Sequence, residues 1–305
     1  MDHSHLLQQI KQVEKIARAS KVQRMFFHPI KYLFAILHRK LIYPFRGSLA
    51  TKSTTFFGED MHLLLPASTD IYLTGGKSHE SEIRLAKFMI HNLSKGDCFV
   101  DVGAHYGYFT LLASKLVDGT GEVHSFEAAS TTYAMLKKNS TSKENIKYYH
   151  KAVADQNGTI TFHEFPNLYS EYNSIDIKQF KNNSWFSKLT PQQISVETVD
   201  LSSFLSQEKL SPKLIKIDVE GAELKVIKGA VNYLQKHTPL IAMEYLKSER
   251  SNVVHQQAVE LLNSLGYTYS IINADGLLVE CEDIDAYLVR HQLESDNIVF
   301  RKKVF

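Results

Sequence analysis

The sequence predicts an α/β protein with a mostly parallel sheet that is covered by helices on both faces. From Cys98 onward, short apolar runs alternate with longer segments of helical periodicity, which is the pattern of β-α-β units. Two of these runs end in glycine turns, at Gly103 and Gly221, that lead directly into a helix. Hydrophobic residues make up 44% of the 305 residues and charged residues 22%, which is typical of a globular domain with its own core.

Residues 1–75 are predicted to form an N-terminal extension of helices and a hairpin. Apolar residues recur at helical spacing as far as Phe45, so we expect helices over residues 1–47. A hairpin should follow, with its strands at Thr54–Phe57 and Met61–Leu65.

The extension is basic, although the formal net charge of the whole chain is only +2. We expect it to cap the main domain or, alternatively, to make peripheral contact with anionic lipid or with a partner. Because basic charge is confined to this segment, no nucleic-acid partner is expected. In residues 1–47 only Asp2 and Glu14 oppose the basic residues, which are Lys11, Lys15, Arg18, Lys21, Arg24, Lys31, Arg39, Lys40 and Arg46.

Residues 76–305 are predicted to form the main domain. Two insertions interrupt it: the aromatic-rich residues 156–199, which should contain a strand at Gly158–Phe162 and act as a substrate lid, and the acidic residues 275–294. Helices are expected at Ser81–Leu93, Phe109–Val117, Thr131–Lys138, Ala222–Gln235 and Val254–Leu265. Strands are expected at Cys98–Val102, Glu122–Phe126, Ile146–His150, Leu214–Ile217, Leu240–Met243, Tyr267–Ile272 and Asn297–Arg301.

The first candidate site is the turn that follows the strand Cys98–Val102. Gly103 and Gly107 lack the Cβ atoms that would keep a ligand from the backbone, and the next helix begins with free N–H groups. The spacing G-x-x-x-G departs from the G-x-G-x-x-G of dinucleotide sites, and the carboxylate of Asp101 would repel phosphates. A cationic ligand suits this turn better.

Two further candidates follow along the chain. Glu127 ends the next predicted strand, where a carboxylate can accept hydrogen bonds from both hydroxyls of a ribose. Ala152 and Val153 come after the third strand, and their small apolar side chains could pack against an adenine ring.

The most specific motif is the string KIDVEGAE, which begins at Lys216. Period-two alternation places Lys216 and Asp218 on one face of a strand, and ligands of open α/β sheets bind beyond the carboxyl ends of strands. Charged groups in such a crevice are costly to desolvate, so their presence there indicates that they bind a ligand or act on it. Asp218 and Glu220 are therefore candidate catalytic residues, and Lys216 is either catalytic or an ion-pair partner. Glu244 ends the next strand and is either functional or a surface residue.

These motifs, in this order, resemble the FkbM family of methyltransferases, with the strings FVDVGA and KIDVEGAE as the informative parts. The similarity runs from about Gly96 to Tyr245 and includes the terminal strand at Ser295–Phe300. It implies a Rossmann-like class I methyltransferase fold of seven strands, the last of them antiparallel. It also implies S-adenosylmethionine as the cofactor.

The resemblance assigns roles to individual residues and shows two departures. His105 stands where the family usually has Asn, and histidine is bulkier and can titrate near neutral pH. Ala128 stands where the family usually has Pro. The implied cofactor-binding residues are Asp101, Gly103, Ala104, His105 and Gly107 at the methionyl end, Glu127 at the ribose, and Ala152 and Val153 at the adenine.

The implied activity is O-methyl transfer to a hydroxyl group, with Asp218, or else Glu220 or Glu244, accepting the hydroxyl proton. We expect a saccharide or glycolipid acceptor, because the aromatic residues between Tyr169 and Phe186 would stack on sugar rings. A small natural product is the alternative acceptor. An inactive cofactor-binding scaffold and a nicotinamide-dependent oxidoreductase are the alternative functions. No metal is expected, although Asp218 and Glu220 could bridge one.

The sequence also predicts a cytoplasmic protein, which would lie at the inner membrane surface if the basic extension binds lipid. Cys98 and Cys281 are far apart, which excludes a disulfide scaffold, and no secretory signal is visible. The apolar run Tyr32–Leu37 is too short to cross a membrane, which takes about 20 residues. The oligomeric state stays open.

Overall fold

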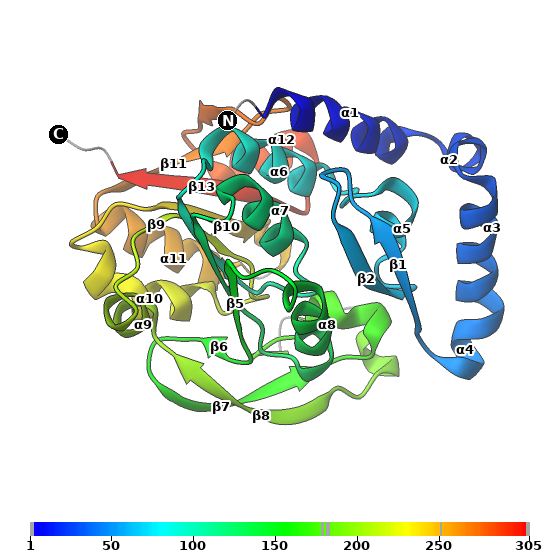
Figure 1. Ribbon diagram of the computed structural model, residues 1–305. Coiled ribbons are helices and arrows are strands. Elements are labelled where there is room, and N and C mark those ends of the chain that lie inside the picture. Colours follow the sequence, from blue (N-terminus) through cyan, green and yellow to red (C-terminus); the bar gives the residue numbers. More distant parts are fainter. Residues whose placement is uncertain (1–2, 178–179, 181–183, 251, 303–305) are drawn as a thin grey trace.

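The computed structural model describes residues 3–177, 180, 184–250 and 252–302, and an eight-stranded sheet forms its centre (Figure 1). The strands lie in the order β12-β11-β13-β10-β9-β3-β4-β5. Their bounds are Cys98–Val102 (β3), Glu122–Phe126 (β4), Ile146–Tyr149 (β5), Pro212–Ile217 (β9), Leu240–Leu246 (β10), Tyr267–Ile272 (β11), Leu278–Glu280 (β12) and Ser295–Lys302 (β13).

The directions of the strands confirm the predicted fold class. Strands β5, β4, β3, β9 and β10 run parallel, and β13 lies antiparallel between β10 and β11. The sheet has eight strands rather than the expected seven, because the acidic insertion contributes the short strand β12, which pairs antiparallel with β11.

Helices cover both faces of this sheet, as predicted. Leu112 and Ile227 come from opposite faces and are fully buried in the two hydrophobic cores that result. One face carries α6 (Glu80–Asn92), α7 (Tyr108–Val117) and α8 (Ser130–Ser140), and the other carries α9 (Leu201–Gln207), α10 (Glu223–Leu234) and α11 (Val253–Ser264). The helix α12 (Ile284–His291) comes from the acidic insertion.

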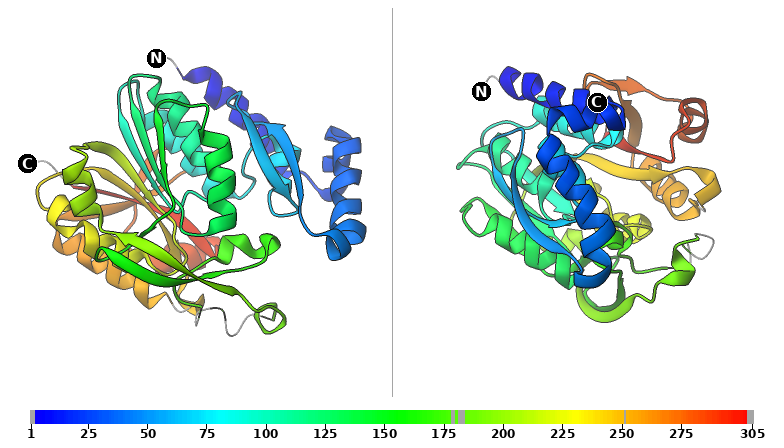
Figure 2. Two further views of the ribbon diagram at one scale, coloured as in Figure 1. Left: turned by 60° about the horizontal axis from the view of Figure 1, so that its bottom comes forward. Right: turned by 90° about the vertical axis from the view of Figure 1, so that its right-hand side faces the viewer.

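The N-terminal extension is helical, as predicted. Leu6, Ile10 and Val13 of α1 (Ser4–Arg18) are buried against α6 and belong to the core of the main domain. Because that core is shared, the boundary between residues 1–75 and 76–305 stays a prediction. A column of helices follows and stands at the edge of the molecule (Figures 1 and 2). It consists of α2 (Lys21–Phe27), α3 (Pro29–Leu37), a π-helical turn (His38–Ile42) and α4 (Tyr43–Arg46).

The hairpin is present, but its first strand lies earlier than predicted. β1 (Leu49–Thr54) pairs antiparallel with β2 (Asp60–Leu65), whereas Thr54–Phe57 had been expected to be the strand. Residues 55–59 form the turn instead, because Gly58 has a φ of +84° and the Thr55 hydroxyl accepts a hydrogen bond from the amide of Glu59 at 3.1 Å. The helix α5 (Thr69–Thr74) follows.

The aromatic-rich insertion builds a second, smaller sheet. β7 (Gly158–Glu164) begins at the predicted residue, and it pairs with the strand β8 (Gln192–Val199), which was not predicted; β6 (Ala152–Val153) completes the sheet (Figure 2). Residues 178–179 and 181–183 of the insertion lie outside the described residues. Its role as a lid stays a prediction.

No described helix combines the length and the apolar content that a membrane-spanning segment needs.

Candidate active site

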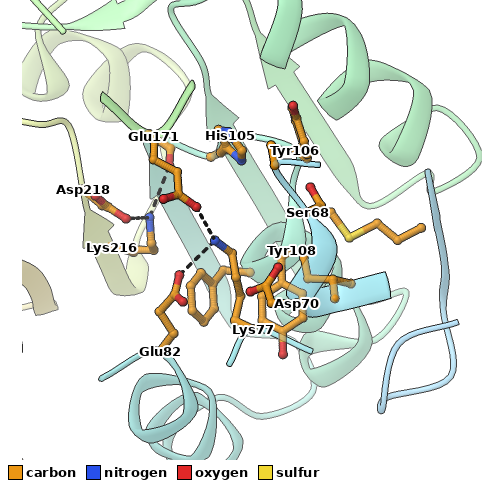
Figure 3. Close-up of a pocket in the computed structure, with 16 residues that line it drawn as sticks. Ser68, Asp70, Lys77, Glu82, His105, Tyr106, Tyr108, Glu171, Lys216 and Asp218 are labelled. Carbon is orange, nitrogen blue, oxygen red and sulfur yellow. Dashed lines mark hydrogen bonds and ion pairs between the residues drawn. The ribbon is translucent and has the colours of Figure 1, made fainter. Parts of the chain in front are cut away.

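Two cavities meet at Gly103, beyond the carboxyl ends of β3 and β9. Each of the two cavities has a volume of about 40 Å³. The first, here called the acidic cavity (Figure 3), is lined by Met61, Ala67, Ser68, Asp70, Ile71, Lys77, Glu82, Gly103, Ala104, His105, Tyr106, Tyr108, Phe109, Glu171, Lys216 and Asp218. The second, here called the apolar cavity, is lined by Val102, Gly103, Phe126, Ala128, Lys151, Ala152, Val153, Phe162, Asn173, Ile175, Val219 and Ala222.

The protein backbone itself requires Gly103. Its φ is +80°, and a Cβ there would lie 1.7 Å from the carbonyl oxygen of Asp218. Gly107 has a φ of +88°, and its Cβ would lie 2.8 Å from Cδ1 of Leu136. We expected both glycines to make room for a ligand. Gly103 does line both cavities, but the described lining of neither cavity includes Gly107, whose missing Cβ makes room for α8.

His105 lines the acidic cavity in a left-handed conformation, with a φ of +51°, which Asn, Asp and His adopt more readily than other residues with a side chain. Its ring stacks on Tyr106, and its Nε2 lies 3.0 Å from the hydroxyl of Ser170. Burial, and after it the charges of Lys77 and Lys216, lowers the pKa of His105 well below its ordinary value. The buried ring therefore stays uncharged at neutral pH.

Glu127 ends β4 and holds the glycine turn in place. Its Oε2 accepts a hydrogen bond from the backbone N–H of His105 at 2.7 Å. Its Oε1 accepts from the amide of Ala129 at 2.9 Å and from the hydroxyl of Thr132 at 2.7 Å. Burial raises the pKa of Glu127 above its ordinary value even though these hydrogen bonds oppose the effect. Ribose binding by Glu127 stays a prediction, for which about one acceptor site of the carboxylate remains after these three hydrogen bonds.

Lys216 is buried beneath the acidic cavity between two carboxylates. Its Nζ lies 3.4 Å from Asp101, 3.2 Å from Asp218, and 3.2 Å from the Gly103 carbonyl, to which it donates. Burial lowers the pKa of Lys216, but the charges of Asp218 and Asp101 outweigh burial and raise it above its ordinary value. Asp101 is fully buried and also accepts from the Thr110 hydroxyl at 2.7 Å. Direct contact between Asp101 and the cofactor stays a prediction.

A second ammonium group, that of Lys77, was missed in the sequence. Its Nζ lies 3.0 Å from Glu82 and 3.9 Å from Glu171 (Figure 3). Burial lowers the pKa of Lys77, but the neighbouring carboxylates outweigh burial and raise it well above its ordinary value. Glu171 belongs to the aromatic-rich insertion and Lys77 precedes α6, so the contact joins segments that are far apart in the chain. No local motif marked either residue.

Negative charge exceeds positive charge in the lining of the acidic cavity. Burial raises the pKa of Asp70, but the carboxylates still outnumber the ammonium groups if Asp70 is protonated. This excess favours a ligand that carries positive charge. The groups concerned are the carboxylates of Asp70, Glu82, Glu171 and Asp218 and the ammonium groups of Lys77 and Lys216.

The apolar cavity has the character expected of an adenine site. Ala152 and Val153 line it, as the sequence predicted, together with the rings of Phe126 and Phe162. A flat aromatic group is well suited to a space between small side chains and aromatic rings. Because Gly103 borders both cavities, one elongated ligand can reach from the acidic cavity into the apolar one.

Three carboxyl groups gather beside the carboxyl end of β9. Asp218 and Glu220 follow that strand, whereas Glu244 lies inside β10, which continues to Leu246 and does not end at Met243 as predicted. Oxygen atoms of Asp218, Glu220 and Glu244 lie within 4.8 Å of one another, and we call these residues the carboxyl trio. Burial, and after it the charge of Asp218, raises the pKa of Glu244 to about 8. Burial, and after it the charge of Glu244, raises the pKa of Glu220 well above its ordinary value. Carboxyl groups this close titrate together, so the trio retains a proton at neutral pH.

The carboxyl trio bears on two predictions from the sequence. It brings Glu244 beside Asp218 and Glu220, and a functional role for Glu244 stays a prediction. Its oxygen spacing would also suit a divalent cation, since carboxylate oxygens are the preferred ligands of such ions. The expected absence of a metal stays a prediction.

The aromatic residues of the insertion pack on one another beside the carboxyl trio. Trp185 stacks on Tyr169 and Tyr172, with ring centroids 5.0 Å and 4.7 Å apart. Burial, and after it the charge of Glu171, raises the pKa of Tyr172, and the charges of Glu220 and Glu244 add to this effect. The same insertion contacts the trio where the Ser174 hydroxyl donates to the backbone carbonyl of Glu220 at 2.6 Å.

The fold and the site together define a methyltransferase of the Rossmann-like class I type. The sheet has a reversed strand between β10 and β11, and the glycine turn after β3 rests on an acid at the end of β4. The sequence profile of the methyltransferase FkbM domain matches residues 101–269, which is more than half of the chain. The chain belongs to the FkbM family of methyltransferases. This assignment excludes the alternative of a nicotinamide-dependent oxidoreductase.

The individual relatives have low sequence identity to this chain. The chain is 25% identical over 203 residues to "Methyltransferase sdnD" of Sordaria araneosa, which covers 58% of this chain and 76% of that protein. It is 25% identical over 189 residues to "Methyltransferase 1" of Beauveria bassiana, which covers 58% and 74%. A crystal structure of methyltransferase FkbM from Methylobacillus flagellatus KT superposes with a TM-score of 0.40 at 13% identity, over 77% of this chain and 52% of that one.

Proposed function

We propose that this methyltransferase uses S-adenosylmethionine and transfers the methyl group to a hydroxyl of a saccharide or glycolipid. The observation that carries the proposal is the pair of cavities that meet at Gly103, one acidic and one apolar, with the carboxyl trio beside them. S-adenosylmethionine has the matching layout, with a cationic sulfonium and amino group at one end and an adenine ring at the other. When bound, its sulfonium supplies the methyl group.

The acidic cavity would hold the methionyl end of this cofactor. Carboxylates such as Asp218 and Glu171 would face the positive sulfonium and amino groups, and the ammonium of Lys77 would face the methionyl carboxylate. The apolar cavity would hold the adenine between Ala152, Val153 and the phenylalanine rings. Glu127 would bind the ribose from the end of β4.

The carboxyl trio would take the proton of the acceptor hydroxyl. A base works best when its pKa lies near the working pH, and Glu244, with a pKa of about 8, meets that condition. Asp218, which the sequence favoured as the base, pairs with the Lys216 ammonium at 3.2 Å. We therefore assign proton transfer to Glu244 together with Glu220, and we assign orientation of the bound groups to Asp218 and Lys216.

The acceptor class rests on the aromatic cluster beside the trio. Tyr169, Tyr172 and Trp185 are partly exposed, so their rings offer apolar faces next to carboxyl groups. Sugars have apolar faces that stack on aromatic rings and hydroxyls that donate to carboxylates. This combination favours a saccharide over an apolar natural product.

Calorimetric titration with S-adenosylmethionine and with its demethylated product tests the cofactor site. The Glu127→Ala variant should bind about 10- to 100-fold more weakly, because hydrogen bonds to a charged group contribute about 1.5–3 kcal/mol. Glu122→Ala is the matched control, because Glu122 begins the same strand and is exposed. Failure of the wild-type protein to bind either compound, or equal weakening in both variants, would refute the assignment.

Transfer of labelled methyl groups to oligosaccharides and glycolipids tests the acceptor. The label should resist alkaline hydrolysis, as a methyl ether does and a methyl ester does not. Labelling of a small non-saccharide compound instead would refute the acceptor class, and cofactor binding without any transfer would indicate an inactive scaffold. Activity should survive EDTA; its loss, with recovery in magnesium, would show that the carboxyl trio holds a cation.

A further inference from the structure

The helical column of residues 21–46 exposes an unusual amount of apolar surface. Eleven of the sixteen large hydrophobic side chains that lie exposed in the described part of the chain belong to this column. Phe26, Ile30 and Phe45 are 76%, 84% and 87% exposed. Exposed apolar surface of this extent marks an interaction site rather than an ordinary protein surface.

The apolar side chains follow one another along the column. Ile30, Leu33, Leu37 and Leu41 recur every three or four residues, which is the spacing of neighbours on a helix surface, and all four are exposed. In the same column only Ala35 and His38 are buried. The column thus presents a stripe of aliphatic side chains that nothing in the described part of the chain covers.

Basic residues accompany this stripe without any acidic ones. Residues 15–58 contain nine Lys and Arg residues and no Asp or Glu. Two basic side chains of the column have internal roles: Arg24 donates to the carbonyl of Ala19 at 3.0 Å, and Lys31 donates to that of Tyr72 at 3.4 Å. Among the described residues, no ion pair engages the others, which are Lys21, Arg39, Lys40 and Arg46.

We propose that the column formed by α2, α3, the π-helical turn and α4 docks on an anionic lipid surface. Helices with exposed aliphatic and aromatic side chains and basic flanks bind at the boundary between headgroups and acyl chains. Lys and Arg add attraction to anionic lipids. A second copy of the chain is a poorer occupant, because two such columns would bring like charges together.

The same column rests directly on the wall of the acidic cavity. Tyr72 of α5 receives the hydrogen bond from Lys31 and lies 6.4 Å from the ring of Phe34, between centroids. Its neighbours Asp70 and Ile71 line the cavity. Docking through the column would therefore hold the site close to the lipid surface, where a lipid-linked acceptor would lie. Lipid binding itself goes beyond the proposed methyl transfer and does not depend on it.

Flotation of the full chain with lipid vesicles tests the proposal. The protein should float with vesicles that contain phosphatidylglycerol and not with vesicles of phosphatidylcholine alone, and salt should weaken the binding. Ile30→Ser/Phe45→Ser should lose about tenfold or more in partitioning because it removes apolar contacts, and Arg39→Gln/Lys40→Gln should lose as much because it removes charge. Since no cofactor is needed, failure here leaves the methyl-transfer proposal untouched.

The matched control is Val253→Ser/Val289→Ser, which changes exposed apolar residues of α11 and α12 and should bind as the wild type does. All variants alter exposed side chains, so their unfolding midpoints should equal that of the wild type. Absence of binding to anionic vesicles would overturn the proposal. So would variants of the column that bind as well as the control, or concentration-dependent assembly of the chain that the column variants abolish.

Discussion

Replacing Lys216 by Met tests whether charge compensation holds the centre of the site together. Methionine keeps most of the apolar stem, so the variant isolates the loss of the ammonium group. Asp101, which is fully buried, would then keep only the Thr110 hydroxyl among the partners described above. A carboxylate without a compensating charge is far more costly inside a protein than in water.

We expect Lys216→Met to lower the free energy of unfolding by about 3–5 kcal/mol, the usual cost of breaking a buried ion pair from one side. The double variant Asp101→Asn/Lys216→Met removes both charges. Neutral replacement of a whole buried pair is often tolerated, so the double variant should regain most of the lost stability.

Urea unfolding followed by circular dichroism measures both effects, provided that the slopes agree between variants. Lys213→Met is the matched control: Lys213 is an exposed residue of the same strand, and its replacement should change stability by no more than about 0.5 kcal/mol. A loss below about 1 kcal/mol for Lys216→Met is the size that surface ion pairs contribute, and it would refute the role of charge compensation at this site. A double variant less stable than the single one would do the same.

Two further predictions concern the turn and the trio. Gly103→Ala should cost more than the roughly 1–2 kcal/mol of a left-handed alanine, because its Cβ would meet the Asp218 carbonyl. Gly119→Ala, whose Cβ would have no atom within 4 Å, is the control, and equal melting temperatures would contradict this account. Burial raises the pKa of Glu244 from 4.5 to about 8, so the folded protein keeps a proton that the unfolded chain releases between these values, and stability should fall as pH rises through that range. With Glu244 as the base, kcat/KM of the wild type should rise as the pH passes about 8, because the carboxyl group must lose its proton to act. Glu244→Gln should abolish this rise and flatten the pH dependence of stability. An unchanged pH profile of kcat/KM would show that Glu244 is not the base.

The buried strands were the parts of the fold that the sequence predicted best. β4 and β11 begin and end at the predicted residues, Glu122–Phe126 and Tyr267–Ile272. Strands with both faces covered are mostly apolar along their length, and glycine and polar residues mark their ends. β8 was missed although Ile194 and Val196 alternate with polar residues, because its half-exposed pattern is weak inside a polar insertion.

The candidate site was predictable where its residues follow a strand directly. Asp218 is an example, since it follows β9 directly. Glu244 lies inside β10 and comes level with Asp218 because Met243 pairs with Ile217. Lys77 and Glu171 could not be predicted in this way. They meet only because α6 and the aromatic-rich insertion fold toward the same cavity, and no local spacing records that contact.

The proposed cofactor site draws on residues inside and outside the family match, which covers residues 101–269. The cofactor residues that the sequence predicted lie within this match, and they lie in or just after β3, β4 and β6. Another wall of the acidic cavity comes from residues 61–82, which lie outside the family match. The helix α5 belongs to this segment, and its Tyr72 accepts a hydrogen bond from Lys31 of the helical column. Changes in this one segment would therefore act on the methionyl side of the proposed cofactor site and on the helical column together.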